Sequence, residues 1–262
     1  MKKTLALLLA AVMLLSVLAA CSSKAETPAE PEQTTEEPAQ TPDAPAEETT
    51  EETTAAEEPS QEELDQAAAD EVAAMIDAIY VQTRTNETDA QCEAAKAAWD
   101  ALTDAQKALV EGDEASPDYF GLDTGDASKD DPRNQDDIGE NELLVVSFGT
   151  SFNDSRVADI KGIEDALQEA NPDWSVRRAF TAQIIINHIQ ARDGEKIDNM
   201  EQALERAVAN GVKQLVVQPT HLMHGAEYDE MCDAIDKVRD KFESVEIAEP
   251  MLGEVGNDAT II

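Results

Sequence analysis

Two of the chain's three histidines, His221 and His224, lie in one short stretch, Gln218–Gly225. An imidazole can accept a proton or bind a metal ion near neutral pH. His221 is therefore the candidate catalytic base and metal ligand, with a loop histidine bonded to the backbone as the alternative. His224 is a second candidate metal ligand, because a helical turn would place Glu227 and Glu230 at further three-residue steps on its face.

Two basic side chains that precede this stretch could bind the carboxylate groups of a ligand. Arg177 and Arg178 could each hold a carboxylate with two parallel hydrogen bonds, but alternation along a strand lets at most one of them point to a site. Arg192-Asp193-Gly194 is typical of a turn that ends a helix. His188, within the apolar run Ile184–Ile189, is expected to be a half-buried structural residue.

A third candidate feature is the turn Ser147-Phe148-Gly149-Thr150-Ser151. Its glycine permits close approach to the backbone, and its amides precede a helix, which makes it a natural anion seat. The turn has neither GxGxxG nor the Walker pattern, so nucleotide binding is unsupported.

The elements that must position these residues alternate between strand and helix from Glu142 onward. Apolar runs predict strands at 143–146, 174–179, 215–217 and 245–248. Asp154 or Ser155 could cap a first helix with Val157, Ile160, Ile163 and Leu167 on one face, and further helices are expected around 184–189, 199–210 and 228–238. This alternation predicts an α/β fold, an open parallel sheet with flanking helices, and ligand sites at the carboxyl ends of its strands.

A small all-α module is expected before the sheet, at residues 60–112. Ser60 and Glu63 have capping-box spacing, and apolar residues recur at helical spacing from Val72 to Ile79. A second helix should start after Thr88-Asp89, and a third after Thr103, ending at Gly112. We expect this module to be a spacer or contact domain, joined to the sheet by a linker or long surface loop at 113–141.

The N-terminal residues are typical of an exported lipoprotein. Lys2 and Lys3, an apolar core and the segment Leu18-Ala19-Ala20-Cys21 predict a signal peptide at 1–20, with Cys21 as the lipidated mature N-terminus; an uncleaved anchor is the alternative. Residues 21–59, rich in Pro, Thr and Glu, predict a disordered acidic stalk. The protein is thus expected to be exported and anchored by Cys21 to the outer face of the cell membrane.

Charge and cysteine content restrict the partners. A formal net charge of −38 opposes nucleic acid, which is excluded as a partner, whereas a cationic or metal-bearing ligand remains compatible. Cys92 and Cys232 are not in a CxxC spacing, and two unpaired, mostly buried thiols are expected.

At the three turns the sequence resembles a known family. Residues 144–151 (LVVSFGTS), 177–181 (RRAFT), 192–194 (RDG), 216–221 (VVQPTH) and 225–228 (GAEY) look like the N-terminal half of anaerobic sirohydrochlorin cobaltochelatases of the CbiK type. The likeness covers about 142–262. It implies a lyase that inserts Co(II) into a carboxylated tetrapyrrole without ATP, for cobalamin biosynthesis, in a cleft between two similar α/β halves.

The resemblance also assigns expected roles. Tetrapyrrole-binding residues would be Ser147, Gly149, Thr150, Ser151, Phe180 and Thr181, and cobalt would be the substrate metal, with haem or another metallotetrapyrrole as a possible ligand. The family's metal-binding residues belong to its second half, before which this chain is expected to be truncated, and Phe148-Gly149 stands where a histidine could end the first strand. The alternatives are therefore a non-catalytic tetrapyrrole- or metal-binding lipoprotein and a structural remnant. Two copies could also pair as a homo-oligomer.

Overall fold

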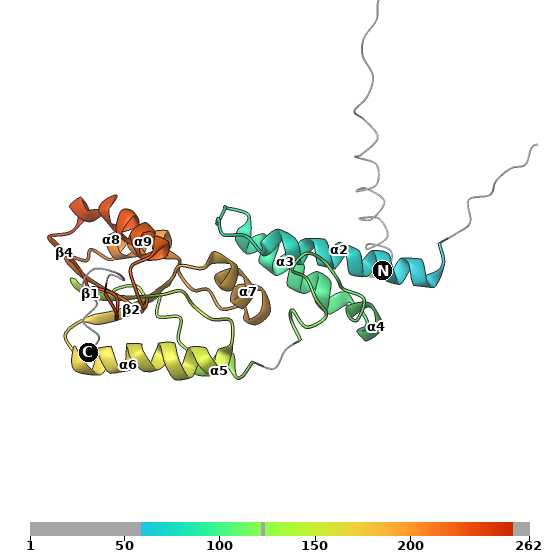
Figure 1. Cartoon of the computed structure of the whole chain (residues 1–262), viewed down its shortest axis with the longest axis horizontal. Coiled ribbons are helices and arrows are strands. Elements are labelled where there is room, and N and C mark those ends of the chain that lie inside the picture. Colours follow the sequence, from blue (N-terminus) through green and yellow to red (C-terminus); the bar gives the residue numbers. More distant parts are fainter. Residues whose placement is uncertain (1–58, 122–123, 254–262) are drawn as a thin grey trace, which may run out of the picture. The chain divides into compact units, whose positions relative to one another are not determined.

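The computed structural model describes residues 59–121 and 124–253 (Figure 1). Its centre is a sheet of four parallel strands, in the order β2-β1-β3-β4. The strands are β1 (Asn141–Ser147), β2 (Ser175–Phe180), β3 (Gln214–Pro219) and β4 (Ser244–Ile247). The predicted open parallel α/β sheet is confirmed. The apolar run in β1 belongs to a central strand, which is buried on both faces.

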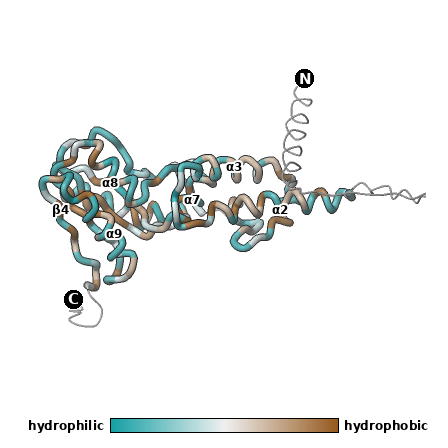
Figure 2. Tube along the Cα trace, turned by 90° about the horizontal axis from the view of Figure 1, so that it is seen from above, coloured by the Kyte–Doolittle hydropathy of each residue, from teal (hydrophilic) through white to brown (hydrophobic). Residues whose placement is uncertain are grey.

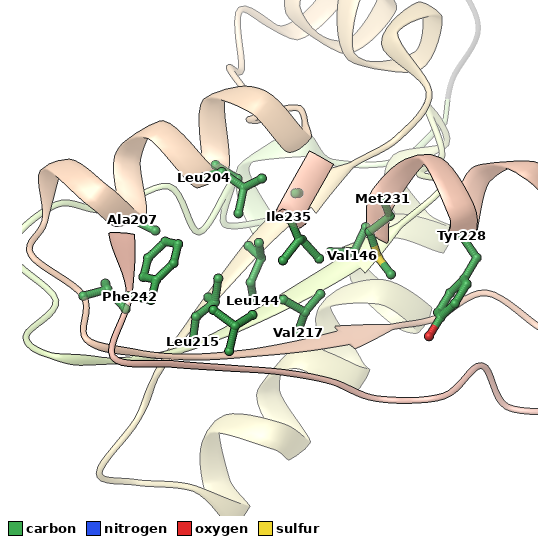
Figure 3. Close-up of a cluster of buried hydrophobic side chains, with 14 residues drawn as sticks. Leu144, Val146, Leu204, Ala207, Leu215, Val217, Tyr228, Met231, Ile235 and Phe242 are labelled. Atoms are coloured by element: carbon green, nitrogen blue, oxygen red, sulfur yellow. The ribbon is translucent and has the colours of Figure 1, made fainter. Parts of the chain in front are cut away.

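One face of the sheet is covered by α8 (Met200–Ala209) and α9 (Ala226–Asp236). Alternate residues of β1 and β3 point to this side, where Leu144 and Val217 pack with side chains of both helices (Figure 3). Leu204, Met231 and Ile235 supply the helical part of the cluster. The 3₁₀ turn η3 (Arg239–Lys241) then leads into β4.

The opposite face packs against a helix with an irregular start. It begins as α5 (Asn153–Ser155), continues through a π-helical turn, η2 (Arg156–Ile160), and ends as α6 (Lys161–Ala170). The predicted cap at Asp154 or Ser155 is wrong: the N-cap is Phe152, and the Asp154 amide donates 2.8 Å to the carbonyl of Thr124.

The predicted apolar face of this helix is also partly wrong. Ile163 is 44% exposed, whereas Glu164 is fully buried. A π turn adds a residue to the helical repeat and rotates the face that meets the sheet. An acidic side chain is therefore buried here, and it needs a cationic partner.

Two faces of α7 (Gln183–Asp193) are buried. Ile186 and Ile189 pack against Phe180 and Ile197, while Ala191 belongs to the core of the N-terminal helices. The helix ends at Gly194 with φ 73°, which confirms Arg192-Asp193-Gly194 as a terminating turn.

The N-terminal helices are α2 (Gln61–Ile79), α3 (Thr88–Ala101) and α4 (Asp104–Lys107). The predicted capping box at Ser60 and Glu63 is present, and Thr103 caps α4, which is shorter than predicted. Polar and apolar residues interchange along α2, α3 and α7 (Figure 2). The buried side chains of this cluster include Val72, Ile76, Ile79, Cys92, Trp99, Tyr119 and Phe120.

Residues 113–121 and 124–140 are irregular apart from the 3₁₀ turn η1 (Ala127–Lys129), but they are more than a solvent-exposed linker. Tyr119 and Phe120 are buried with the N-terminal helices, and Arg133 is buried beside the sheet. A polar segment was not expected to bury such residues, because it lacks a periodic apolar pattern.

The predicted signal peptide, Cys21 and almost all of the predicted stalk lie outside the described residues, as does the chain beyond 253. Within the described ranges, no helix combines the length and the apolar character needed to cross a membrane.

Candidate functional site

The predicted turns meet where the parallel strands end. The Thr181 amide donates 2.9 Å to the carbonyl of Ser147, and the Thr220 amide donates 2.8 Å to that of Val146. The hydroxyl of Thr220 also donates 2.9 Å to Ser147 Oγ. Parallel pairing of β2, β1 and β3 thus brings the loops after Ser147, Phe180 and Pro219 together, as predicted.

Gly149 lies directly against the ring of Phe180. Its φ is 100°, and a Cβ built there would lie 2.5 Å from Phe180 Cδ2. Glycine is required here for two reasons: the backbone angle is positive, and there is no space for a Cβ. Both residues were predicted for ligand binding, but Phe180 is fully buried and here serves to shape the loop.

His221 is the most unusual polar side chain at this edge. Its side chain is 9% exposed, and neither ring nitrogen has a hydrogen-bond partner among the described residues. Burial lowers the pKa of His221, and the nearby Glu227 carboxylate only partly opposes that shift. The ring is therefore neutral at pH 7 and keeps an unused lone pair.

A cavity of about 420 Å³ surrounds this imidazole. Most of its lining is apolar, with Phe148, Leu222 and Met223 among the side chains and Glu227 as the carboxylate. Phe148 is 44% exposed and Met223 45% exposed. Such an edge offers a flat apolar molecule a surface to cover.

The predicted metal cluster of His221, His224, Glu227 and Glu230 is not formed. The ring of His224 bonds to Glu249 at 2.9 Å and lies 4.2 Å from the ring of Tyr228, centroid to centroid. Within the described ranges, no group of three or more His, Cys, Asp or Glu side chains is placed to hold a metal ion. His224 is thus drawn to a different carboxylate from the one beside His221.

Neither predicted arginine is available to a ligand. Arg177 is fully buried on the α8 side, 3.0 Å from both Glu142 and Asp198. Burial raises the pKa of Glu142 to about 7, against the attraction of Arg177. The predicted alternation is confirmed, but both faces of β2 bury their arginine against carboxylates.

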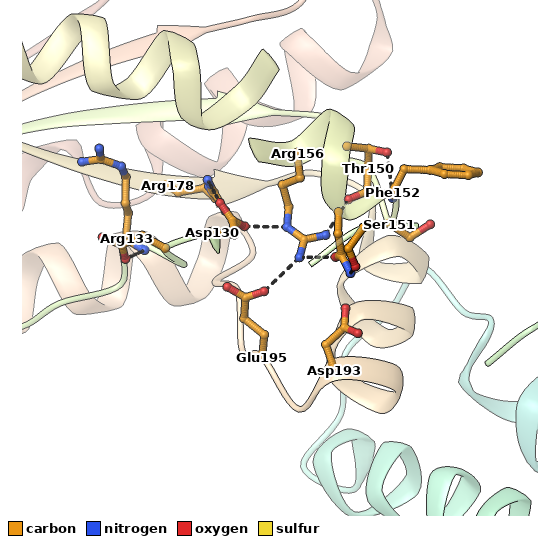
Figure 4. Close-up of polar contacts among 12 residues, drawn as sticks. Asp130, Arg133, Thr150, Ser151, Phe152, Arg156, Arg178, Asp193 and Glu195 are labelled. Atoms are coloured by element: carbon orange, nitrogen blue, oxygen red, sulfur yellow. Dashed lines mark hydrogen bonds and ion pairs between the residues drawn. The ribbon is translucent and has the colours of Figure 1, made fainter. Parts of the chain in front are cut away.

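Arg178 belongs to a second buried network beneath the turn 147–151 (Figure 4). It bonds to Glu164 at 2.8 Å and to Asp130 at 2.7 Å. Asp130 also accepts 2.5 Å from Arg156 Nε. Burial alone would favour protonation of Asp130, but Arg178 and Arg156 hold the pKa of its carboxyl below the ordinary value.

The same network fixes the turn. Arg156 donates 3.2 Å to the carbonyl of Thr150, and Arg192 donates 2.7 Å to that of Ser151. Thr150 Oγ1 accepts from the amide of Phe152. These contacts hold Thr150 and Ser151 at the sheet edge, and they show that arginines support the turn from within.

A second cavity, also about 420 Å³, lies between α8 and α9. Its lining includes Thr181, whose hydroxyl is buried without a hydrogen-bond partner in the described chain. Glu227 lines this cavity as well as the cavity around His221. The two cavities thus share one carboxylate.

The other candidates have structural surroundings. His188 is half-buried, stacks on Tyr119 at 4.2 Å and bonds to its carbonyl at 2.8 Å. Cys92 and Cys232 are both unpaired, as expected, and burial raises the pKa of the Cys92 thiol to about 11.

Several features of the site had no sequence signal of their own. The partnerless imidazole and the sharing of Glu227 between cavities depend on packing of distant segments, which spacing does not reveal. The apolar rim of Phe148, Leu222 and Met223 could have been suspected, because large apolar residues stand there in turns.

Residues 141–261 match the family described as Cobalt chelatase (CbiK). Over 110 residues the chain is 36% identical to the sirohydrochlorin cobaltochelatase of Salmonella typhimurium, covering 42% of each chain. Over 117 residues it is 26% identical to the sirohydrochlorin cobaltochelatase CbiKC of Nitratidesulfovibrio vulgaris, covering 44% of this chain and 41% of that one.

These similarities confirm the resemblance to CbiK-type chelatases over this region. The chain spans less than half the length of the curated relatives it matches. Their names carry cobalt and sirohydrochlorin, whereas haem gains no support from them.

Proposed function

We propose that the region from 141 onward acts on a sirohydrochlorin-type tetrapyrrole and takes part in inserting Co(II) into it, without ATP. The observation that carries this proposal is His221, a nearly buried neutral imidazole with both nitrogens unpartnered in an apolar cavity at the carboxyl ends of the strands. The names of the matching relatives support the choice of metal and macrocycle.

The chemistry asks for a base beside a flat ligand. Two pyrrole N–H protons leave as one Co(II) enters, so charge balances without any other reactant. A neutral imidazole can accept one of these protons or hold the metal. Glu227 Oε2 lies 3.7 Å from His221 Nε2, and it would stabilise the imidazolium that forms.

The apolar rim suits the macrocycle. Phe148, Leu222 and Met223 line the cavity and present apolar surface beside His221. Burying such side chains against a flat ligand contributes about 25 cal/mol per Å². The ligand's carboxylates would remain at the edge, in water.

The direct test adds sirohydrochlorin to the full chain and follows its absorbance spectrum with and without Co(II). We expect one spectral shift on binding and a second shift on metallation. His221→Ala should lower both the binding affinity and the rate of metallation at least tenfold. His224→Ala is the matched control, because that ring is paired with Glu249. No spectral change with the unaltered chain would reject the proposal.

A second candidate function is binding of the tetrapyrrole without insertion. This function is favoured by the small number of metal-binding side chains, since the described residues offer no group of three that could hold a metal ion. Binding without metallation in the same experiment would select this function.

We also propose that the protein is a lipoprotein on the outer face of the membrane, held by Cys21. The support is the pattern of residues 1–21, which lie outside the described ranges. Detergent partitioning of the full chain and of Cys21→Ala tests it. Equal partitioning of the two would reject the anchor.

Self-association is a further proposal. Large apolar side chains are exposed in the loops after β1, β3 and β4, namely Phe148, Phe152, Leu222, Met223, Met251 and Leu252. A second copy covering them would enclose the cavity around His221. Sedimentation that shows only monomer at high concentration, with and without tetrapyrrole, would contradict this.

A further inference from the structure

The N-terminal helices are joined to α7 by buried polar contacts. Asn187, fully buried, donates 2.8 Å to the carbonyl of Ile79 and so satisfies a terminal carbonyl of α2. Asp89 accepts from Gln190 at 2.8 Å and from Lys196 at 3.0 Å. Residues 60–121 are therefore docked by specific hydrogen bonds, which a passive spacer does not need.

The same contacts continue to the cavity between α8 and α9. Gln183 donates 2.8 Å to Asn187 Oδ1 and accepts 2.7 Å from Asn199, which in turn caps α8. Gln183 and Asn199 both line that cavity. An unbroken chain of side-chain amides thus runs from the end of α2 to the cavity wall.

The N-terminal helices also supply part of the wall. Gln82, in the segment between α2 and α3, is exposed and lines the cavity together with Thr181. Residues 60–121 lie outside the stretch that matches the chelatase family. This wall is therefore an addition to the region of similarity.

The charged side chains of the cavity are mostly acidic. The cavity is lined by Glu201, Glu205, Glu227 and Glu230 and by one cation, Lys237. Within the described chain, Glu201, Glu205 and Glu230 form no ion pair. Such a lining attracts a divalent cation and repels the carboxylates of a tetrapyrrole.

A second observation concerns the end of this cavity. Glu227 belongs to both cavities. His221 lines only the other one; its side chain is 9% exposed, and its unpartnered Nε2 lies 3.7 Å from the Glu227 carboxylate. Since the described residues hold no cluster of three metal ligands, the acidic cavity suits passage better than storage.

We propose that the N-terminal helices and the loop between them complete the site: Asn187 of α7 holds the end of α2 in place, and Gln82 of the loop forms part of the wall of an acidic cavity by which the metal substrate reaches Glu227 and His221. This inference rests on the proposed function for the identity of the metal. It makes Gln82 a residue that sets access for the metal, not for the macrocycle.

The test changes charge at Gln82 in the full chain. Gln82→Lys should weaken Co(II) binding and raise KM for Co(II) about five- to tenfold, and Gln82→Glu should shift both the other way, with KM for sirohydrochlorin unchanged. The matched controls are Gln66→Lys and Gln66→Glu, which make the same charge changes at an exposed position of α2 that does not line this cavity.

Titration of Co(II) binding separates the two proposals. If the unaltered chain binds Co(II) but inserts none, the proposal of cobalt insertion is rejected. The effect of the Gln82 variants on Co(II) binding still tests whether Gln82 controls access of the metal. Equal effects at Gln82 and Gln66 would overturn the inference, and so would a complete lack of Co(II) binding at millimolar concentration.

Discussion

The Nε2 atom of His221 and the Oε2 atom of Glu227 are 3.7 Å apart, close enough for charge attraction but beyond hydrogen-bond distance. The imidazole therefore feels a carboxylate without using up its lone pair on it. Burial acts the other way and dominates, so that the pKa of His221 falls below its ordinary value. Within the described chain, both nitrogens of this neutral, nearly enclosed ring therefore remain free to bind a ligand.

The first prediction concerns pH. The pKa of His221 is lower in the folded chain than the ordinary value of about 6.5, so below that pH the unfolded chain binds the proton first. This side chain should therefore reduce the free energy of unfolding as pH falls through 6.5 towards the folded pKa. In denaturant unfolding between pH 5 and 8, the stabilities of the native chain and of His221→Gln should differ by a constant amount above about pH 7, and the native chain should lose more stability below about pH 6.5. A difference that stays constant over the whole range would contradict the prediction.

The second prediction concerns Gly149. Gly149→Ala should destabilise the fold by roughly 2–4 kcal/mol, because its Cβ would meet the buried Phe180 ring and its φ is 100°. Gly194→Ala is the matched control: its φ is 73°, but nothing lies within 4 Å, so backbone strain alone should cost about 1–2 kcal/mol. Thermal unfolding of both variants measures the difference, and equal losses would show that the ring contact is harmless.

The third prediction concerns the buried arginine of β2. Arg178→Met should cost about 3–5 kcal/mol, because it leaves Glu164 and Asp130 buried with fewer cations. The double variant Arg178→Met/Glu164→Leu should recover part of this loss. Lys241→Met, which removes an exposed partner of Asp240, should change stability by less than about 1 kcal/mol. A loss as small for Arg178 would mean that the network contributes little.

The fourth prediction concerns the docking of the N-terminal helices. Asn187→Leu should cost about 1–3 kcal/mol, because it leaves the carbonyl of Ile79 buried and unsatisfied. The two tryptophans report separately, since Trp99 lies in the N-terminal helical cluster and Trp174 beside β2. In single-tryptophan variants, the unfolding transitions should coincide for the native chain and separate for Asn187→Leu. Transitions that are already separate in the native chain would show that the two parts fold independently.

The sheet could be predicted from the sequence because its strands are short continuous apolar runs between helical segments. The helix over 153–170 could be placed but not oriented. Its π turn exposes Ile163 and buries Glu164, and that choice depends on Arg178 in the next strand. Periodicity within one segment carries no information about such a partner.

The candidate site was predictable in part for a similar reason. His221 could be placed at the end of a strand from the order of elements, and spacing also suggested a shared face with His224. In the folded chain Glu249, 25 residues further on, takes up His224 instead. Equally, the buried face of α7 escaped prediction because it carries Asn187 and Gln190, whose polarity is typical of an exposed surface.

Because α7 is buried on two faces, the boundary of the family match does not coincide with a boundary between independently packed parts of the chain. A fragment cut where the family match begins, at 141, would keep the face of Ile186 and Ile189 but would strip Asn187 and Gln190 of Ile79 and Asp89. The stretch that matches the chelatase family therefore depends, in this chain, on hydrogen bonds from residues that the match does not include.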